Sequence, residues 1–126
     1  MRLAGLVLET EHFEDYLSFL TEVLELELAH LADDRMVLEL QGTWMEICKS
    51  AGAPKQNELT MRFLMAPEEY EELVNKISFF YYRKGESGFQ VRALDGNQCR
   101  LIDPDGRAWC FSHALTISPQ NTVAIL

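Results

Sequence analysis

The stretch LIDPDGRAWCFSH, at residues 101–113, places a cysteine between two aromatic residues shortly after a turn signal. In a β-strand the two aromatic side chains would point to one face and Cys110 to the other. A thiol there acts as a nucleophile or a metal ligand only where a nearby cation or base lowers its pKa. Arg62 and Arg100 are the candidate cations, and a small inert thiol is the simpler interpretation.

The turn before this cysteine is predicted by its residue types. Pro104 presets φ at the second turn position, Asp103 can bond back to the backbone, and Gly106 accepts a positive φ. Elsewhere, His12, His30 and His113 show neither HxH nor HxxxH spacing, which argues against a histidine metal cluster. Glycine-rich phosphate loops and nucleophile elbows are also absent from the sequence.

Composition narrows the class of protein. The chain has 126 residues, 48% of them hydrophobic, enough for the core of one domain. Its net charge of −9 argues against nucleic-acid and anionic-membrane partners, which require a basic surface. Three cysteines, an odd number, predict reduced thiols and a cytoplasmic location. No apolar run approaches the length of a membrane span.

The periodicity of apolar residues predicts the elements of the first half. Residues 12–26 carry one apolar stripe at helical spacing, and the segments around them alternate as strands do. The expected order is a strand at 3–10, the helix at 12–26, and strands at 26–31, 35–40 and 43–49.

The same order recurs in the second half. Pro67 stands at the first position of a helix whose stripe includes Tyr70, Leu73, Val74 and Ile77. We expect strands at 58–66, 78–83, 97–103 and 108–113, with 84–96 as a long, partly extended loop. The aromatic run FFYY within 78–83 is read as a strand with one buried face, or less simply as the aromatic wall of a ligand site.

A doubled βαβββ unit follows from this order. We predict a single α+β domain over 1–126, with modules at about 1–49 and 58–113, a linker at 50–57 and a tail at 114–126. Each module must bury its sheet under its helix and leave the other face free. Two such mixed sheets side by side would form a curved cup.

Two stretches carry a resemblance to a known family. LAGLVLETEHFEDYLSFLTEVLELEL (3–28) looks like the opening strand and helix of the vicinal oxygen chelate superfamily, with Glu25 where a glycine is usual. RLIDPDGRAWCF (100–111) looks like its closing hairpin. The superfamily includes glyoxalases, bleomycin-resistance proteins and extradiol dioxygenases. The resemblance implies the glyoxalase/bleomycin-resistance-like fold, with four metal-ligand positions in the cup.

Mapped onto this chain, those positions fall on Gly5, Glu46, Thr60 and Cys110. Strand alternation supports the mapping, because it predicts that these four residues face the cup together with Val7, Glu9, Trp44 and Arg62. It places on the helix side Leu6, Leu8, Met45, Ile47, Met61, Phe63, Met65, Trp109 and Phe111. Glycine has no ligating side chain and threonine is a poor ligand, so we predict no metal and no cofactor.

Other cup residues have two interpretations each. Glu46 either forms a structural ion pair with Arg62 or contacts a ligand, and Trp44 either stacks on a planar ligand or covers the rim of the cup. The predicted ligand-binding set is Glu46, Trp44, Arg62, Thr60, Arg100 and Cys110. We expect Glu46, Arg62 and Trp44 to line one shared pocket.

Three functions remain open. The first is metal-free binding of a small molecule, in which acidic groups attract cationic compounds. The second is a metal-dependent glyoxalase-like lyase or dioxygenase whose ligands are misaligned here, and the third is a protein-interaction module with a degenerate cup. The strands at 3–10 and 58–66 would be exposed edges in a monomer, so we also predict a homodimer.

Overall fold

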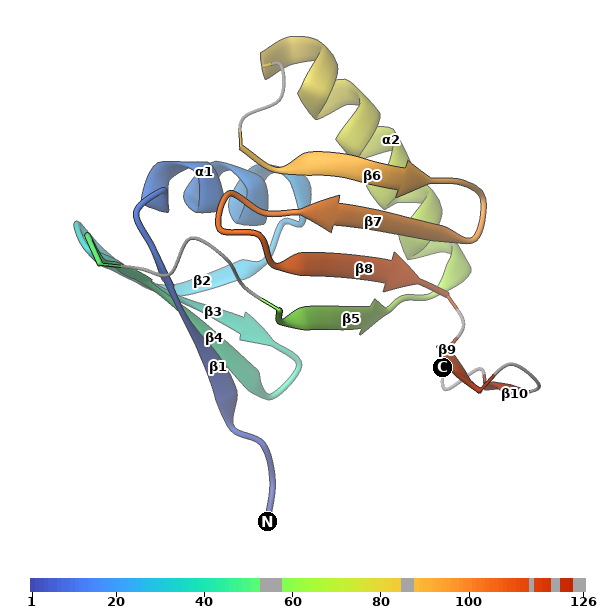
Figure 1. Ribbon diagram of the computed structural model, residues 1–126, viewed down its shortest axis with the longest axis horizontal. Coiled ribbons are helices and arrows are strands. Elements are labelled where there is room, and N and C mark those ends of the chain that lie inside the picture. Colours follow the sequence, from blue (N-terminus) through green and yellow to red (C-terminus); the bar gives the residue numbers. More distant parts are fainter. Residues whose placement is uncertain (53–57, 85–87, 114, 119–120, 124–126) are drawn as a thin grey trace. The chain divides into compact units, whose positions relative to one another are not determined.

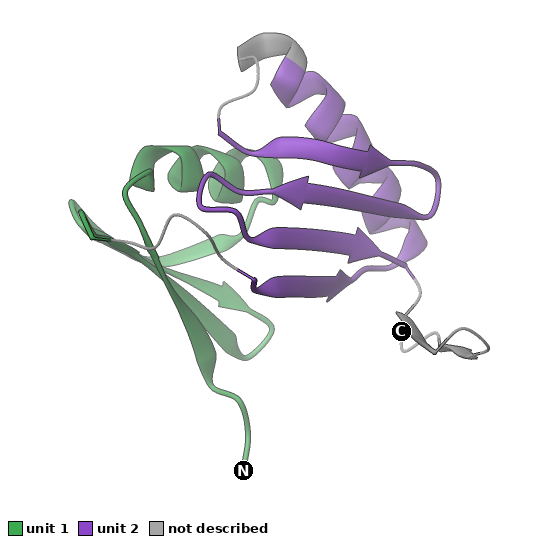
Figure 2. Ribbon diagram, in the orientation of Figure 1, with its two compact units in different colours: residues 1–55 green, residues 56–126 purple. Residues whose placement is uncertain are grey.

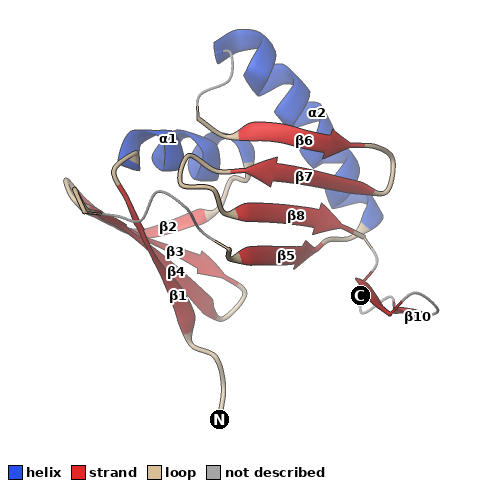
Figure 3. Cartoon of the chain, in the orientation of Figure 1, coloured by secondary structure: helices blue, strands red, loops and turns tan. Residues whose placement is uncertain are grey.

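Each half of the chain builds one four-stranded mixed sheet with helical segments on one face (Figure 1). The computed structural model describes residues 1–52, 58–84, 88–113, 115–118 and 121–123. It divides into two units, residues 1–55 and residues 56–126 (Figure 2). The α+β class is confirmed by the arrangement of helices and strands (Figure 3). Of the predicted linker, residues 53–57 lie outside the described residues.

The first unit has the predicted βαβββ order. Its elements are β1 (Gly5–Thr10), α1 (Phe13–Ser18), the π-helical segment η1 (Phe19–Val23), β2 (Glu27–Ala32), β3 (Arg35–Leu40) and β4 (Thr43–Lys49). The strand order is β1-β4-β3-β2, with β1 parallel to β4 and the other pairs antiparallel. The single predicted helix is therefore an α-helical turn followed by a π-helical one.

The second unit repeats this connectivity. Its elements are β5 (Thr60–Leu64), α2 (Pro67–Lys84), β6 (Gln90–Leu94), β7 (Gln98–Ile102) and β8 (Ala108–Ser112). The strand order β5-β8-β7-β6 matches that of the first sheet element for element, and α2 crosses one face of it (Figure 1). Within the predicted tail, β9 (Leu115–Ser118) and β10 (Asn121–Val123) form an antiparallel pair.

The predicted strand at 78–83 is wrong, because these residues continue α2. Helical spacing persists beyond Ile77 to Phe80, which is buried, whereas the neighbouring Phe79 is 60% exposed. Aromatic residues favour strands only weakly, and a buried helical stripe overrides that preference. The strand that completes the sheet is β6, inside the segment 84–96 that was predicted as a loop.

Strand alternation is confirmed by the burial of the side chains. One side of the first sheet is buried, and its buried residues are Leu8, Thr10, Met36, Leu38, Met45 and Ile47. In the second sheet the residues of the buried side are Met61, Cys99, Leu101, Trp109 and Phe111, while Ala108 is buried on the opposite side at the start of β8. The helical segments add Phe13, Tyr16, Phe19, Leu20, Val23, Tyr70, Leu73, Ile77 and Phe80 to the buried set.

The turn between β7 and β8 is held by a buried carboxylate. Asp103 Oδ1 accepts the backbone N–H groups of Asp105 and Arg107, each at 2.9 Å, and Oδ2 accepts Nε1–H of Trp109 at 2.9 Å. The guanidinium of Arg107 lies 3.6 Å from Asp103 and 3.5 Å from Asp105. Gly106 has a φ of 91°, as the turn signal predicts. The family-like DPDG sequence therefore serves the hairpin that carries Cys110.

Among the described residues, no helix combines the length and the apolar composition that a membrane span requires.

Candidate functional site

The side of the first sheet opposite its buried face, here called the N face, carries polar side chains from all four strands. Paired residues on neighbouring strands share a face, so the register defines the N face. Its rows are Gly5, Trp44, Glu39 and Glu27; Val7, Glu46, Val37 and His30; and Glu9, Cys48, Arg35 and Ala32. Trp44 is 44% exposed and Val7 62% exposed.

Glu46 has a partner within its own sheet. Its carboxylate forms an ion pair with the guanidinium of Arg35, which stands diagonally across from it on β3. The predicted pairing with Arg62, a residue of the second unit, stays a prediction, while Arg35 is the partner that the first unit itself supplies. Sequence reasoning missed Arg35 because its closeness to Glu46 depends on the register of β3 against β4. The shared pocket of Glu46, Arg62 and Trp44 stays a prediction.

Gly5 is required by the backbone of the first sheet. A Cβ at this position would lie 2.2 Å from the backbone oxygen of Trp44, far inside contact distance. The two strands meet closely there, and the N–H of Trp44 donates to the carbonyl oxygen of Ala4 at 2.9 Å. A ligand-bearing side chain therefore does not fit this backbone at position 5.

The corresponding side of the second sheet, the C face, brings three of the predicted residues into one row. Cys110 on β8 is paired with Arg62 on β5 and with Arg100 on β7. The remaining C-face positions are Thr60, Leu64, Gln90, Arg92, Ala93, Gln98, Ile102, Ala108 and Ser112. Arg62, Arg100 and Thr60 are exposed, and Cys110 is half-buried.

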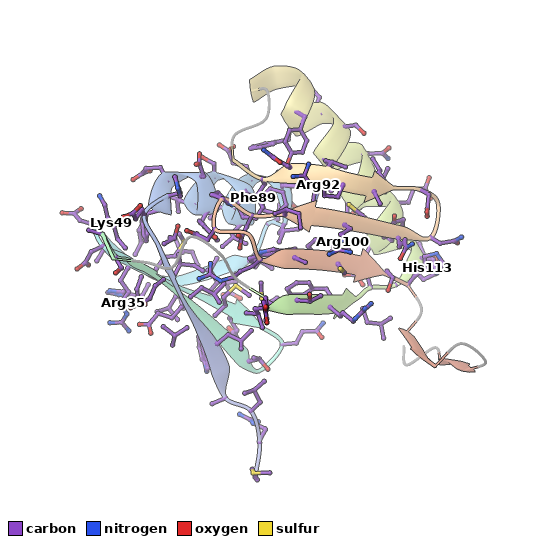
Figure 4. The ribbon with its side chains drawn as sticks, in the orientation of Figure 1. Arg35, Lys49, Phe89, Arg92, Arg100 and His113 are labelled. Carbon is purple, nitrogen blue, oxygen red and sulfur yellow. The ribbon has the colours of Figure 1, made fainter. Side chains whose placement is uncertain are left out.

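Arg92 is a C-face residue that sequence reasoning missed. The register of β6 against β7 shifts between Val91 and Ala93, which makes Arg92 the extra residue of a β-bulge. Its guanidinium donates to Oε1 of Gln90 at 2.6 Å. Figure 4 shows Arg92 and Arg100 on the side of the second sheet away from α2. Alternation in QVRAL could have indicated the strand, but the bulge leaves no sequence signal.

The three thiols lie in different surroundings, and all three are free. Partial burial raises the pKa of the Cys48 thiol, and the carboxylate of Glu46 raises it further. Burial also raises the pKa of Cys99, on the buried side of β7, to about 11. Cys110 is the thiol whose register partners on both neighbouring strands are arginines.

A separate groove of about 620 Å³ opens on the helix side of the second unit. It is lined by Pro67, Tyr70, Glu71, Val74, Asn75, Leu94, Asp95, Gly96 and His113. The Tyr70 hydroxyl donates to the carbonyl oxygen of Asp95 at 2.7 Å, and burial raises the pKa of Tyr70 to about 12. The groove includes none of the predicted site residues.

Within the described residues, no group of three His, Cys, Asp or Glu side chains is arranged to hold a metal ion. Glu46 is paired with Arg35, and Cys110 lies between two cations that repel a divalent ion. The residues at the four mapped positions therefore do not fit a metal.

Comparisons with known proteins agree on the fold. No protein-family model matches the sequence, and no curated protein matches it closely enough to count. Among solved structures, a mutant of the fosfomycin resistance protein FosX from Listeria monocytogenes, complexed with Mn(II) and 1S,2S-dihydroxypropylphosphonic acid, is 16% identical, with a TM-score of 0.69 over 92% of this chain and 94% of that one.

Two further solved structures have a similar degree of structural similarity to this chain. A possible glyoxalase from Bacillus cereus is 14% identical, with a TM-score of 0.66 over 89% of this chain and 98% of that one. The bleomycin resistance determinant encoded on transposon Tn5 is 17% identical, with a TM-score of 0.62 over 89% and 97%. The resemblance read from the two terminal stretches is thus confirmed for the fold, and the chain has the glyoxalase/bleomycin-resistance fold of the vicinal oxygen chelate proteins.

Proposed function

We propose that this protein binds a small organic molecule on the open faces of its sheets, without a metal ion. The observation that carries the proposal is the set of exposed aromatic and cationic side chains, Trp44, Arg62 and Arg100, held on strands opposite the buried faces. Ligand sites combine apolar contact area with a few placed polar groups, and sites on strands are more precise than sites on loops.

The similar structures support a role towards small molecules. Two of them are named as resistance proteins, one against fosfomycin and one against bleomycin. FosX was solved with Mn(II), whereas the mapped positions of this chain offer a glycine, a threonine and a cysteine flanked by arginines. These residues therefore favour a metal-free binding protein over a metal-dependent lyase or dioxygenase.

A thermal-shift screen tests the binding role. A ligand that binds only the native state raises the melting temperature by an amount set by its concentration and its Kd. For a ligand that stacks on Trp44, Trp44→Ala removes the shift. Phe79→Ala is the matched control, since Phe79 is an exposed aromatic residue on α2, outside the rows that define the N face. A diverse library that produces no shift would favour the protein-interaction module instead.

Elemental analysis tests the absence of a metal. Protein purified without chelator should contain far less than one equivalent of zinc, iron, nickel or manganese per chain. Two results would favour the metalloenzyme instead. One is near-stoichiometric metal that is lost in Glu46→Ala, and the other is glyoxalase activity.

The proposal extends to a cytoplasmic homodimer. The three free thiols support the reducing compartment. β1 and β5 each form an edge of their own sheet, and an unpaired edge strand favours association. Light scattering should give twice the monomer mass at micromolar concentration, and a stable monomer would count against this part.

A further inference from the structure

The C face is a cationic surface on a strongly acidic protein. Three of its described positions are arginines, Arg62, Arg92 and Arg100. No described position of the C face carries a carboxylate. The chain as a whole has a net charge of −9. A solvated surface of average composition on such a chain would be acidic, so the C face departs from the rest of the molecule.

Arg62 and Arg100 stand on either side of Cys110 in a single cross-strand row. Neighbouring strands lie about 4.8 Å apart, so the two Cα atoms are separated by roughly 10 Å. Both side chains are exposed, and within the described part of the chain neither has an ion-pair partner. Cys110 has a short side chain, which leaves room above it for a group that both guanidinium ions can reach.

Two unpaired cations on one row repel each other, and an anion between them removes the repulsion. Guanidinium ions match the oxygens of phosphates and carboxylates with paired, charge-assisted hydrogen bonds. Arg92, at the bulge of β6, adds a third positive charge at the edge of the same face. The row thus offers a site for a single oxyanion.

We propose that the C face binds the oxyanion group of an anionic ligand between Arg62 and Arg100, over Cys110. This inference rests on the proposed function and names the charge class of the ligand, a terminal phosphate, phosphonate or carboxylate. It replaces the cationic compounds that the overall acidity of the sequence suggests.

The first test compares two alkylating reagents on the unmodified protein. In both, the thiolate displaces iodide and forms an S–C bond, but iodoacetate is an anion and iodoacetamide is neutral. Each nearby guanidinium should raise the iodoacetate rate roughly twofold relative to iodoacetamide, so two raise it about fourfold. Cys48, beside Glu46 and Glu9, is the internal comparison and should prefer iodoacetamide. Peptide mass spectrometry at low ionic strength resolves the two sites.

Variants assign the preference to the arginines. Arg62→Gln and Arg100→Gln should each lower the Cys110 ratio about twofold, and the double variant should abolish the preference. Arg2→Gln is the matched control, because it removes the same charge from an exposed residue outside the C face. A Cys110 ratio equal to that of Cys48, or unchanged in the double variant, overturns the inference.

The second test measures anion binding and does not depend on thiol reactivity. Inorganic phosphate, methylphosphonate and acetate, each at constant ionic strength against sodium chloride, should raise the melting temperature of the native chain and of Arg2→Gln. The double variant should show no such rise. Comparing the rise from phosphate and methylphosphonate with the rise from acetate shows whether the site prefers a tetrahedral or a planar oxyanion.

The two proposals fail differently in this second test. If none of the anions acts but a neutral or cationic library compound does, the oxyanion inference falls while ligand binding stands. If neither anions nor library compounds bind, both fall.

Discussion

The N face and the C face share one topology and carry opposite charge. Each lies on a sheet with the same strand order, opposite its buried side. On the N face the carboxylates of Glu9, Glu27, Glu39 and Glu46 accompany one guanidinium, Arg35. The described positions of the C face hold three guanidinium groups and no carboxylate. A repeated fold therefore fixes which positions face outward but leaves their chemistry free to diverge between the units.

The hairpins that close the two sheets also differ. In the first unit β3 and β4 are joined through Gln41 and Gly42, which have φ values of 45° and 86° and are both exposed. In the second unit β7 and β8 are joined by the buried Asp103 network. The hairpin that carries the oxyanion row is thus held by side-chain hydrogen bonds as well as by backbone conformation.

The largest expected effect comes from that network. Asp103→Ala should lower the free energy of unfolding by about 3 kcal/mol or more, because it removes one of the two carboxylates beside the buried Arg107 and the acceptor of the buried Trp109 indole N–H. Urea denaturation measures the loss. Asp95→Ala is the matched control, since Asp95 accepts two backbone N–H groups at an exposed turn, and its loss should be clearly smaller. Equal losses would mean that burial does not distinguish the two turns.

The next largest effect on stability is expected for Gly5→Ala, which tests the difference between the first strands of the two units, β1 and β5. Gly5 is paired with Trp44, whereas the matching position of the second unit, Thr60, is paired with Ala108 and carries a side chain. Gly5→Ala should cost about 1–3 kcal/mol, because its Cβ meets the Trp44 backbone and the strands must separate.

Gly52→Ala is the control for this substitution, since nothing lies within 4 Å of an added Cβ there. A Gly5→Ala protein as stable as the parent would show that β1 and β4 separate freely, and it would reopen position 5 to a ligand side chain.

Much of this fold could be predicted from the sequence, because the buried faces impose a period of two. The strands 35–40 and 43–49 were predicted with their observed bounds, and the facing of Trp44, Glu46, Arg62 and Cys110 agrees with the burial of their neighbours. Such alternation is readable wherever one face of a strand is covered and the other is not.

What could not be predicted depends on contacts between segments. The diagonal pairing of Arg35 with Glu46 follows from strand register, and the outward placement of Arg92 follows from a bulge. The strand predicted at 78–83 failed because local aromatic content competed with a helical stripe that tertiary burial stabilises. Local pattern indicates which face a residue takes, but not which residue lies next to it.

Glu25 gives a smaller effect, of opposite sign. It follows the helical segment of the first unit with a φ of 51°, the left-handed region that favours glycine. The N–H of Leu26 donates to the carbonyl oxygen of Leu20 at 3.0 Å, which fixes this conformation. Glu25→Gly should therefore raise the free energy of unfolding by about 0.5–1 kcal/mol. Glu25→Ala keeps the Cβ and should give no gain, so equal gains from both would assign the effect to charge.

The smallest effect concerns the pH dependence of Cys48 and sharpens the electrostatic contrast between the faces. Burial and then Glu46 raise the pKa of this thiol, while Arg35 lowers it. The thiolate is the reactive form, so Glu46→Gln should shift the pH midpoint of iodoacetamide alkylation down and speed the reaction at pH 7. Arg35→Gln should shift the midpoint up. A Cys48 midpoint that stays unchanged in both variants would show that burial alone sets it, and that the carboxylates of the N face do not act on its chemistry.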